Sequence, residues 1–95
     1  MTALERLVVR NNNAEALRLE WLTLMPSAEM PRPRQFILWV EIHSVEAMLR
    51  AIRQTARKFD VLNGEMSLDF LVRYASKAAN SIEAPHIDSV LTRVM

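Results

Sequence analysis

Apolar residues recur at helical spacing through the middle of the chain, and the clearest case begins after Ser44. Serine is a strong N-cap residue, and Glu46 stands in the first turn, where a carboxylate interacts favourably with the helix dipole. The apolar positions then fit the i, i+3, i+4, i+7 pattern for about four turns. They are Val45, Met48, Leu49, Ile52, Ala56 and Phe59. Asn63 and Gly64 both tolerate a positive φ, so they predict the end of this helix.

A second helix is predicted to follow directly. Ser67 supplies its N-cap, and Asp69 is an acidic residue in its first turn. Its apolar stripe consists of Leu68, Leu71, Val72, Ala75 and Ala78 or Ala79. Further on, Pro85 favours the first turn of a last, short helix. Because so short a helix is marginal alone, it needs the core or a second copy of the chain to bury its apolar side. That side consists of Ile87, Val90, Leu91 and Val94.

The N-terminal third predicts two short helices rather than one long one. Thr2 and Glu5 have the spacing of a capping box, which would start a helix that ends near Arg10. Asparagines at positions 11–13 favour a break, with Asn13 as the N-cap of a helix over residues 14–25. A phase argument supports the break, because the apolar residues on its two sides would face nearly opposite directions on one continuous helix. Those residues are Leu4, Leu7 and Val8 before the break and Leu17, Trp21 and Leu24 after it.

Pro26, Pro31 and Pro33 then predict a linker over residues 26–34. After it, residues 35–43 form an apolar segment whose periodicity is ambiguous between helix and strand. The helical interpretation places on one face Phe36, Trp39, Val40 and His43. The strand interpretation places on one face Phe36, Leu38, Val40 and Ile42. Because a lone strand would have no pairing partner elsewhere in the chain, we expect a short buried helix.

Composition agrees with an all-α protein. The chain has 95 residues, of which 51% are hydrophobic and 24% are charged, a balance typical of one globular domain. Its single glycine, Gly64, is too few for the tight turns of a sheet-rich domain. We therefore expect a single domain over residues 1–95, built as a helical bundle of four to six helices around residues 44–61 and 67–81.

Several chemistries and locations are disfavoured by what the sequence lacks. It contains no cysteine, which excludes a disulfide framework and a thiolate metal site and favours the cytoplasm. Its longest apolar run, residues 36–40, is too short for a membrane span, and Glu5 and Arg6 stand where a signal peptide would begin its apolar region. The two histidines, His43 and His86, are not part of a metal-binding motif. We expect no catalytic residues, no metal, no cofactor and no small-molecule substrate.

The distribution of charge gives the strongest functional indication. The net charge is +1, but residues 31–80 hold eight basic and five acidic side chains. On the helix after Ser44, a basic stripe opposite the apolar face has the spacing to follow a phosphate backbone. This stripe consists of Arg50, Arg53, Arg57 and Lys58, with Gln54 beside them. Arg73 and Lys77 on the next helix would support it, and Arg32 and Arg34 in the proline linker would add a flexible arm.

An ordinary solvated face is the alternative interpretation of this stripe, because every amphipathic helix has a polar side. Salt-bridged faces often carry acidic residues four positions from each basic one. The central residues of this stripe have no such partners, which favours the phosphate-binding interpretation.

The order of elements within residues 44–81 loosely resembles a helix-turn-helix unit. In that family the second helix enters the major groove of DNA and its early residues contact base edges. The resemblance implies that these positions are Ser67, Asp69, Phe70 and Arg73.

A protein-interaction module is the rival hypothesis. Six methionines and two tryptophans suit an adaptable contact surface. The helix over residues 14–25 is apolar on more than one side, since Leu19 and Leu22 point away from its main stripe. The candidate protein-interface residues are Leu17, Trp21, Leu24 and Met25.

We therefore expect a non-enzymatic binding protein. A DNA-associated regulatory or replication-type factor is slightly preferred, with nucleic acid as its partner and the basic stripe on the phosphates. The alternative is a protein–protein interaction module, such as a homodimeric adaptor or a small inhibitor of a larger machine.

Overall fold

The protein is built from four helices. The computed structural model describes the backbone of residues 2–94 and the side chains of residues 2–83. The helices are α1 (Ala3–Leu24), α2 (Pro33–Ile42), α3 (Val45–Val61) and α4 (Leu68–Val94), and residues 2–94 contain no strand. The predicted all-α fold, with four to six helices, is therefore confirmed.

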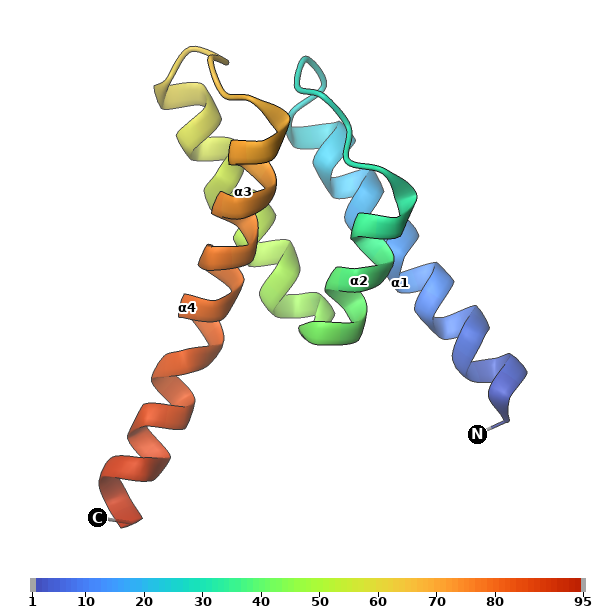
Figure 1. Cartoon of the computed structure of the whole chain (residues 1–95), viewed down its shortest axis with the longest axis vertical. Helices are drawn as coiled ribbons and strands as arrows, with labels where there is room; N and C mark the ends of the chain where they lie inside the picture. The colour runs from blue at the N-terminus through green and yellow to red at the C-terminus, as the bar shows by residue number, and fades with distance from the viewer. Residues whose placement is uncertain (1, 95) are drawn as a thin grey trace.

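Helix α3 lies at the centre of the arrangement. It packs against α1 on one side and against α4 on the other, and α2 packs mainly on α1 (Figure 1). Helices α3 and α4 run antiparallel as a hairpin (Figure 1). The molecule is 18 Å thick, which is about two helix diameters. The first turns of α1 and the last turns of α4 extend beyond the packed core at the same end of the molecule (Figure 1).

The hairpin of α3 and α4 begins and ends as the sequence predicts. The Ser44 hydroxyl accepts a hydrogen bond from the Ala47 N–H at 3.1 Å, and the Ser67 hydroxyl accepts one from the Phe70 N–H at 3.2 Å. Both predicted apolar stripes face the core: Met48, Ile52, Ala56, Phe59, Leu71, Ala75, Ala78 and Ala79 are buried. The connection, residues 62–67, is longer than the three or four residues usual in a helix-turn-helix unit.

Gly64 is required by the turn after α3. Its φ is +76°, and a Cβ built on it would lie 3.3 Å from Cζ of Phe59. We expect Gly64→Ala to lower the free energy of unfolding by about 1–2 kcal/mol, because an L-residue is strained in the left-handed region. Urea denaturation followed by circular dichroism measures this change. Asn63→Gly, at the neighbouring φ of 55°, is the control and is expected to stay within about 0.5 kcal/mol; equal losses in both variants would contradict the argument.

Helix α1 corrects the prediction of two short N-terminal helices. The Thr2 hydroxyl caps it as expected, accepting from the Glu5 N–H at 3.2 Å, but the helix then continues through positions 11–13 without a break. Asparagine in a helix interior costs at most about 0.7 kcal/mol relative to alanine, so three of them do not force a helix to end. The phase argument failed because it assumed that both halves bury their apolar residues in one core. The structure instead leaves Leu4, Leu7 and Val8 exposed.

The apolar segment after the linker is a helix, as expected. Pro33 occupies the first turn of α2 and ends the linker, which begins at Met25. Phe36 and Trp39 are buried and form a three-ring cluster with Trp21 of α1, with ring centroids 5.6–6.2 Å apart. Both indole N–H groups are satisfied, because Trp21 donates to the Glu29 carbonyl at 3.1 Å and Trp39 to the Ser76 hydroxyl at 2.9 Å.

Helix α4 corrects the prediction of a separate last helix starting at Pro85. The backbone stays helical from Leu68 to Val94. A proline within a helix removes one hydrogen bond, here to the carbonyl of Ser81. Ser81 is exposed, so water can satisfy that carbonyl. The predicted apolar side of this segment lies outside the described side chains, as does His86; it consists of Ile87, Val90, Leu91 and Val94.

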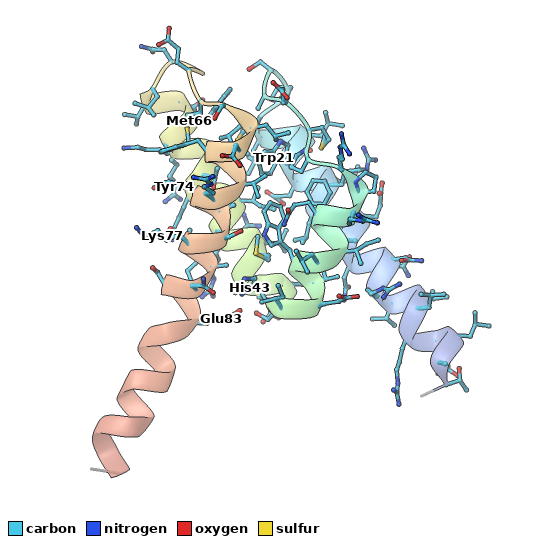
Figure 2. All side chains as sticks on the ribbon, in the orientation of Figure 1. Trp21, His43, Met66, Tyr74, Lys77 and Glu83 are labelled. Carbon is cyan, nitrogen blue, oxygen red and sulfur yellow. The ribbon has the colours of Figure 1, made fainter. Side chains whose placement is uncertain are left out.

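His43 joins the α2–α3 corner to α4. It is buried, and its Nδ1 lies 3.4 Å from Oε1 of Glu83, which also accepts a hydrogen bond from the Ser44 N–H at 3.2 Å (Figure 2). A carboxylate on α4 therefore holds the corner between α2 and α3. This contact is consistent with a structural role for His43 at an element boundary.

Candidate functional site

An open groove of about 450 Å³ lies along the outer side of the α3–α4 hairpin. Helix α4 contributes most of its surface, and α3 contributes Gln54. The lining residues are Gln54, Phe70, Arg73, Tyr74, Lys77, Ala78 and Ser81. Tyr74 and Lys77 lie on successive turns of α4 (Figure 2). The groove thus combines aromatic and basic side chains, and none of the lining residues that the structure describes is acidic.

The aromatic side chains of the groove differ from all others in the protein. The sequence has six aromatic residues, and four of them are buried in the core: Trp21, Phe36, Trp39 and Phe59. The remaining two are Phe70, whose exposed fraction is 50%, and the half-buried Tyr74. Both line this groove. An exposed phenyl ring beside cations is a surface on which a planar group can stack.

Further basic side chains lie on α3 within about one helical turn of Gln54, in addition to those of α4 that line the groove. Arg50, Arg57 and Lys58 stand on the side of α3 away from the core, and Lys77 stands on α4. None of these four forms an ion pair with any side chain of residues 2–83. Arg73 does pair with Asp69 at 3.0 Å, but both side chains are more than 70% exposed. Exposed pairs of this kind contribute about 0.3–0.5 kcal/mol, so an anionic ligand can displace Asp69.

Arg53 does not belong to this set. Its Nε lies 3.5 Å from Oε1 of Glu20 on α1, so it points toward the α1 side of α3. The predicted basic stripe therefore has an acidic partner, which comes from another helix rather than from position i±4. The stripe is thereby divided: Arg53 is partly neutralised, whereas Arg50 and Arg57 have no ion-pair partner among the side chains of residues 2–83.

The structure does not bring Arg32 and Arg34 to the groove. They line a separate cleft of about 380 Å³ between the start of α2 and the other side of α4, together with Leu38, Asp69 and Val72. Asp69, which also pairs with Arg73 of the α3–α4 groove, places a carboxylate in the lining of this second cleft. Both arginines are exposed, but their predicted role as an arm that extends the basic stripe has no geometric support in this arrangement.

A third hollow, of about 140 Å³, lies between α1 and α2 and contains its own ion pair. Arg18 donates two hydrogen bonds to Glu15, at 2.9 and 2.6 Å. These bonds hold the pKa of the Glu15 carboxyl below its usual range. The charges of this hollow cancel each other, so it does not resemble the α3–α4 groove.

Three of the four candidate protein-interface residues are core residues of the chain itself. Leu17 and Trp21 are fully buried and Met25 is 1% exposed, whereas Leu24 is 37% exposed. Leu17, Trp21 and Met25 are covered by other parts of the same chain, so they offer no surface to a partner. The exposed apolar side chains of α1 are instead Leu4, Leu7, Val8, Val9, Leu19, Leu22 and Leu24.

Among residues 2–83, no three histidine or acidic side chains come together to hold a metal ion. His43 has Glu83 as its one acidic neighbour within ion-pair distance in that range. In the part of the chain that the structure describes, no helix combines the length and apolarity needed to cross a bilayer. The α3–α4 groove is thus the hollow whose chemistry most clearly points to a ligand.

The sequence predicts both cations of this groove, Arg73 and Lys77, but not the part that Tyr74 plays in its lining. The helix-turn-helix resemblance implies a base contact for Phe70 but no stacking surface, and it implies no role for Tyr74. The signal was present, because Phe70, Tyr74 and Lys77 recur at helical spacing on the side of α4 that the core stripe does not use. An aromatic residue on the polar side of an amphipathic helix is the feature that points to them.

No protein-family model, curated protein or solved structure matches this chain. The arrangement of side chains in and around the α3–α4 groove is therefore the basis for the function proposed below.

Proposed function

We propose that this protein is a non-enzymatic nucleic-acid-binding protein, a DNA-associated regulatory or replication-type factor of the cytoplasm. The α3–α4 face is its binding surface. The observation that carries the proposal is the groove itself, in which two cations and two aromatic rings stand together and none of the described lining residues is acidic. The nearby carboxylate of Asp69 is held only by its exposed pair with Arg73. Arg73 and Lys77 within it, and Arg50, Arg57 and Lys58 beside it, would contact phosphates.

The charge pattern supports this surface over an ordinary solvated helix face. Two further hollows in the described part of the chain each have a carboxylate in their lining, Asp69 in one and Glu15 in the other. Arginine and lysine side chains that lack ion-pair partners within the fold are free to displace counterions from a phosphate backbone. Release of those counterions supplies much of the affinity of proteins for nucleic acid.

The proposal predicts binding that weakens steeply with salt. Four or five phosphate contacts should reduce the affinity by roughly two decades between ~50 mM and ~200 mM salt. The measurement is a titration of the protein into dye-labelled DNA, followed by anisotropy at both salt concentrations. Both a random-sequence duplex and a single strand of the same length serve as probes.

Two results of this titration would contradict the proposal. Absence of binding to either probe at the lower salt would exclude nucleic acid as the partner and direct attention to the exposed apolar turns of α1. Binding that is independent of salt would show that phosphates are not what the cations contact. A loss of affinity of roughly two decades between the two salt concentrations would support the α3–α4 face as the binding surface.

A further inference from the structure

We propose that the ligand of the α3–α4 groove is single-stranded nucleic acid, with an unpaired base stacked on Phe70. The inference rests on the proposed function and assigns the class of nucleic acid that the site takes. It depends on the aromatic side chains of the groove, whereas the salt-dependent binding expected of the proposed function depends on its cations.

The placement of Phe70 is unusual for this protein. Every other phenylalanine and both tryptophans are buried in the core, while Phe70 leaves half of its surface in water. Phe70 follows Asp69 in the first turns of α4 and does not belong to the buried stripe that begins with Leu71. Its ring therefore contributes little to the core and leaves a flat apolar surface open to a ligand.

An intact duplex does not offer its base faces to this ring. In double-stranded DNA the faces of the bases are stacked on one another inside the helix, so a protein reaches only their edges unless it unstacks a base step, which costs a few kcal/mol. In a single strand the faces are accessible, and stacking on aromatic side chains is the usual way in which proteins hold them. An exposed phenylalanine within a basic groove thus fits an unpaired base and gains nothing from a duplex.

The spacing of side chains along α4 fits alternating contacts with bases and phosphates. Phe70, Tyr74 and Lys77 lie on one side of the helix and line the same groove, within about 10 Å along its axis. A base on Phe70 would leave its own backbone close to Arg73 and Lys77, which are the two cations of the groove. Gln54 and Ser81 offer hydrogen-bonding groups to a base edge at the groove wall.

The test compares three probes on wild-type protein and on Phe70→Leu, which keeps the apolar character but removes the aromatic face. The probes are a short oligothymidylate, an abasic strand of the same length and a duplex of the same length. Wild-type protein should prefer the oligothymidylate. Phe70→Leu should weaken that binding about 5- to 150-fold, the range for loss of one base–aromatic stack, and should leave the abasic strand and the duplex unchanged.

Two controls keep this test decisive. Phe70→Tyr retains an aromatic face and should bind like the wild type. Leu22→Ala removes an apolar side chain of similar exposure from α1, 43% against 50% for Phe70, and should have no effect. If Phe70→Leu binds all three probes as the wild type does, the proposal that a base stacks on Phe70 is wrong. Salt-dependent binding of the wild type would then still support the proposed function. Failure of the wild-type protein to bind any probe would overturn the proposed function as well.

Discussion

Replacing Trp21 with alanine is expected to lower the free energy of unfolding by about 3–5 kcal/mol, the largest single effect that we expect in this protein. Trp21 has no exposed surface, stacks on Trp39 with ring centroids 6.1 Å apart and meets the edge of Phe36 at 6.2 Å. Truncation removes these contacts and leaves a cavity. It also removes the indole N–H that donates a hydrogen bond to the Glu29 carbonyl. Because small domains have about 5–15 kcal/mol of stability in total, the variant should unfold at much lower urea concentration.

The matched control for this prediction lies on the same helix. Leu19→Ala removes a side chain that is 48% exposed and should change the free energy of unfolding by less than about 0.5 kcal/mol. Urea denaturation followed by far-ultraviolet circular dichroism compares the two variants. If Trp21→Ala unfolds at the same urea concentration as the wild type, the predicted loss of stability is wrong. If the variant also associates with itself less than the wild type does, Trp21 contacts a partner, as predicted from the sequence.

The combined variant Arg57→Glu and Lys77→Glu is expected to lower the affinity for nucleic acid at least about 100-fold at ~50 mM salt. Each reversal removes a charge-assisted contact worth about 1.5–3 kcal/mol and adds repulsion toward phosphate. The new carboxylate at position 77 would also stand four residues from Arg73 and compete for its guanidinium. The salt dependence should become shallower as well, since fewer counterions are released. Titration of labelled DNA at both salt concentrations measures both changes.

The control has the same change in net charge at a different place. Arg32→Glu and Arg34→Glu alter the cleft between α2 and the opposite side of α4. They should weaken binding by no more than a few-fold, through the overall field of the protein rather than through lost contacts. Equal losses in the two double variants would show that net charge, and not the α3–α4 face, determines the affinity.

Local signals in the sequence were sufficient to predict the α3–α4 hairpin. Ser44 and Ser67 cap their helices, and Asn63 and Gly64 adopt the positive φ that ends α3. These features act over four or five residues, and the apolar stripes of both helices are buried in the core. The choice of helix over strand for residues 36–42 was also correct, because the absence of a pairing strand is visible in the sequence.

The predictions that failed depended on which apolar residues share a core. The break at positions 11–13 was inferred by assuming that Leu4 and Leu7 are buried with Trp21, and they are exposed. Trp21 is predicted as an interface residue because its helix is apolar on more than one side, but α2 covers it. The sequence does not show this because α2 follows a proline linker whose path it does not specify. The same limit applies to the groove, since the sequence places Phe70 and Lys77 on one helix face but does not show where α3 stands beside them.

The aromatic cluster of Trp21, Phe36 and Trp39 gives the protein a built-in optical reporter of its core. Both indoles are buried and close enough to exchange excitation energy, so their emission should be shifted to the blue in the native state and move to the red on unfolding. Neither indole lines the α3–α4 groove, where the chromophores are Phe70 and Tyr74. Selective excitation of tryptophan therefore measures the folded fraction of a variant in the same cuvette in which its ligand is being titrated.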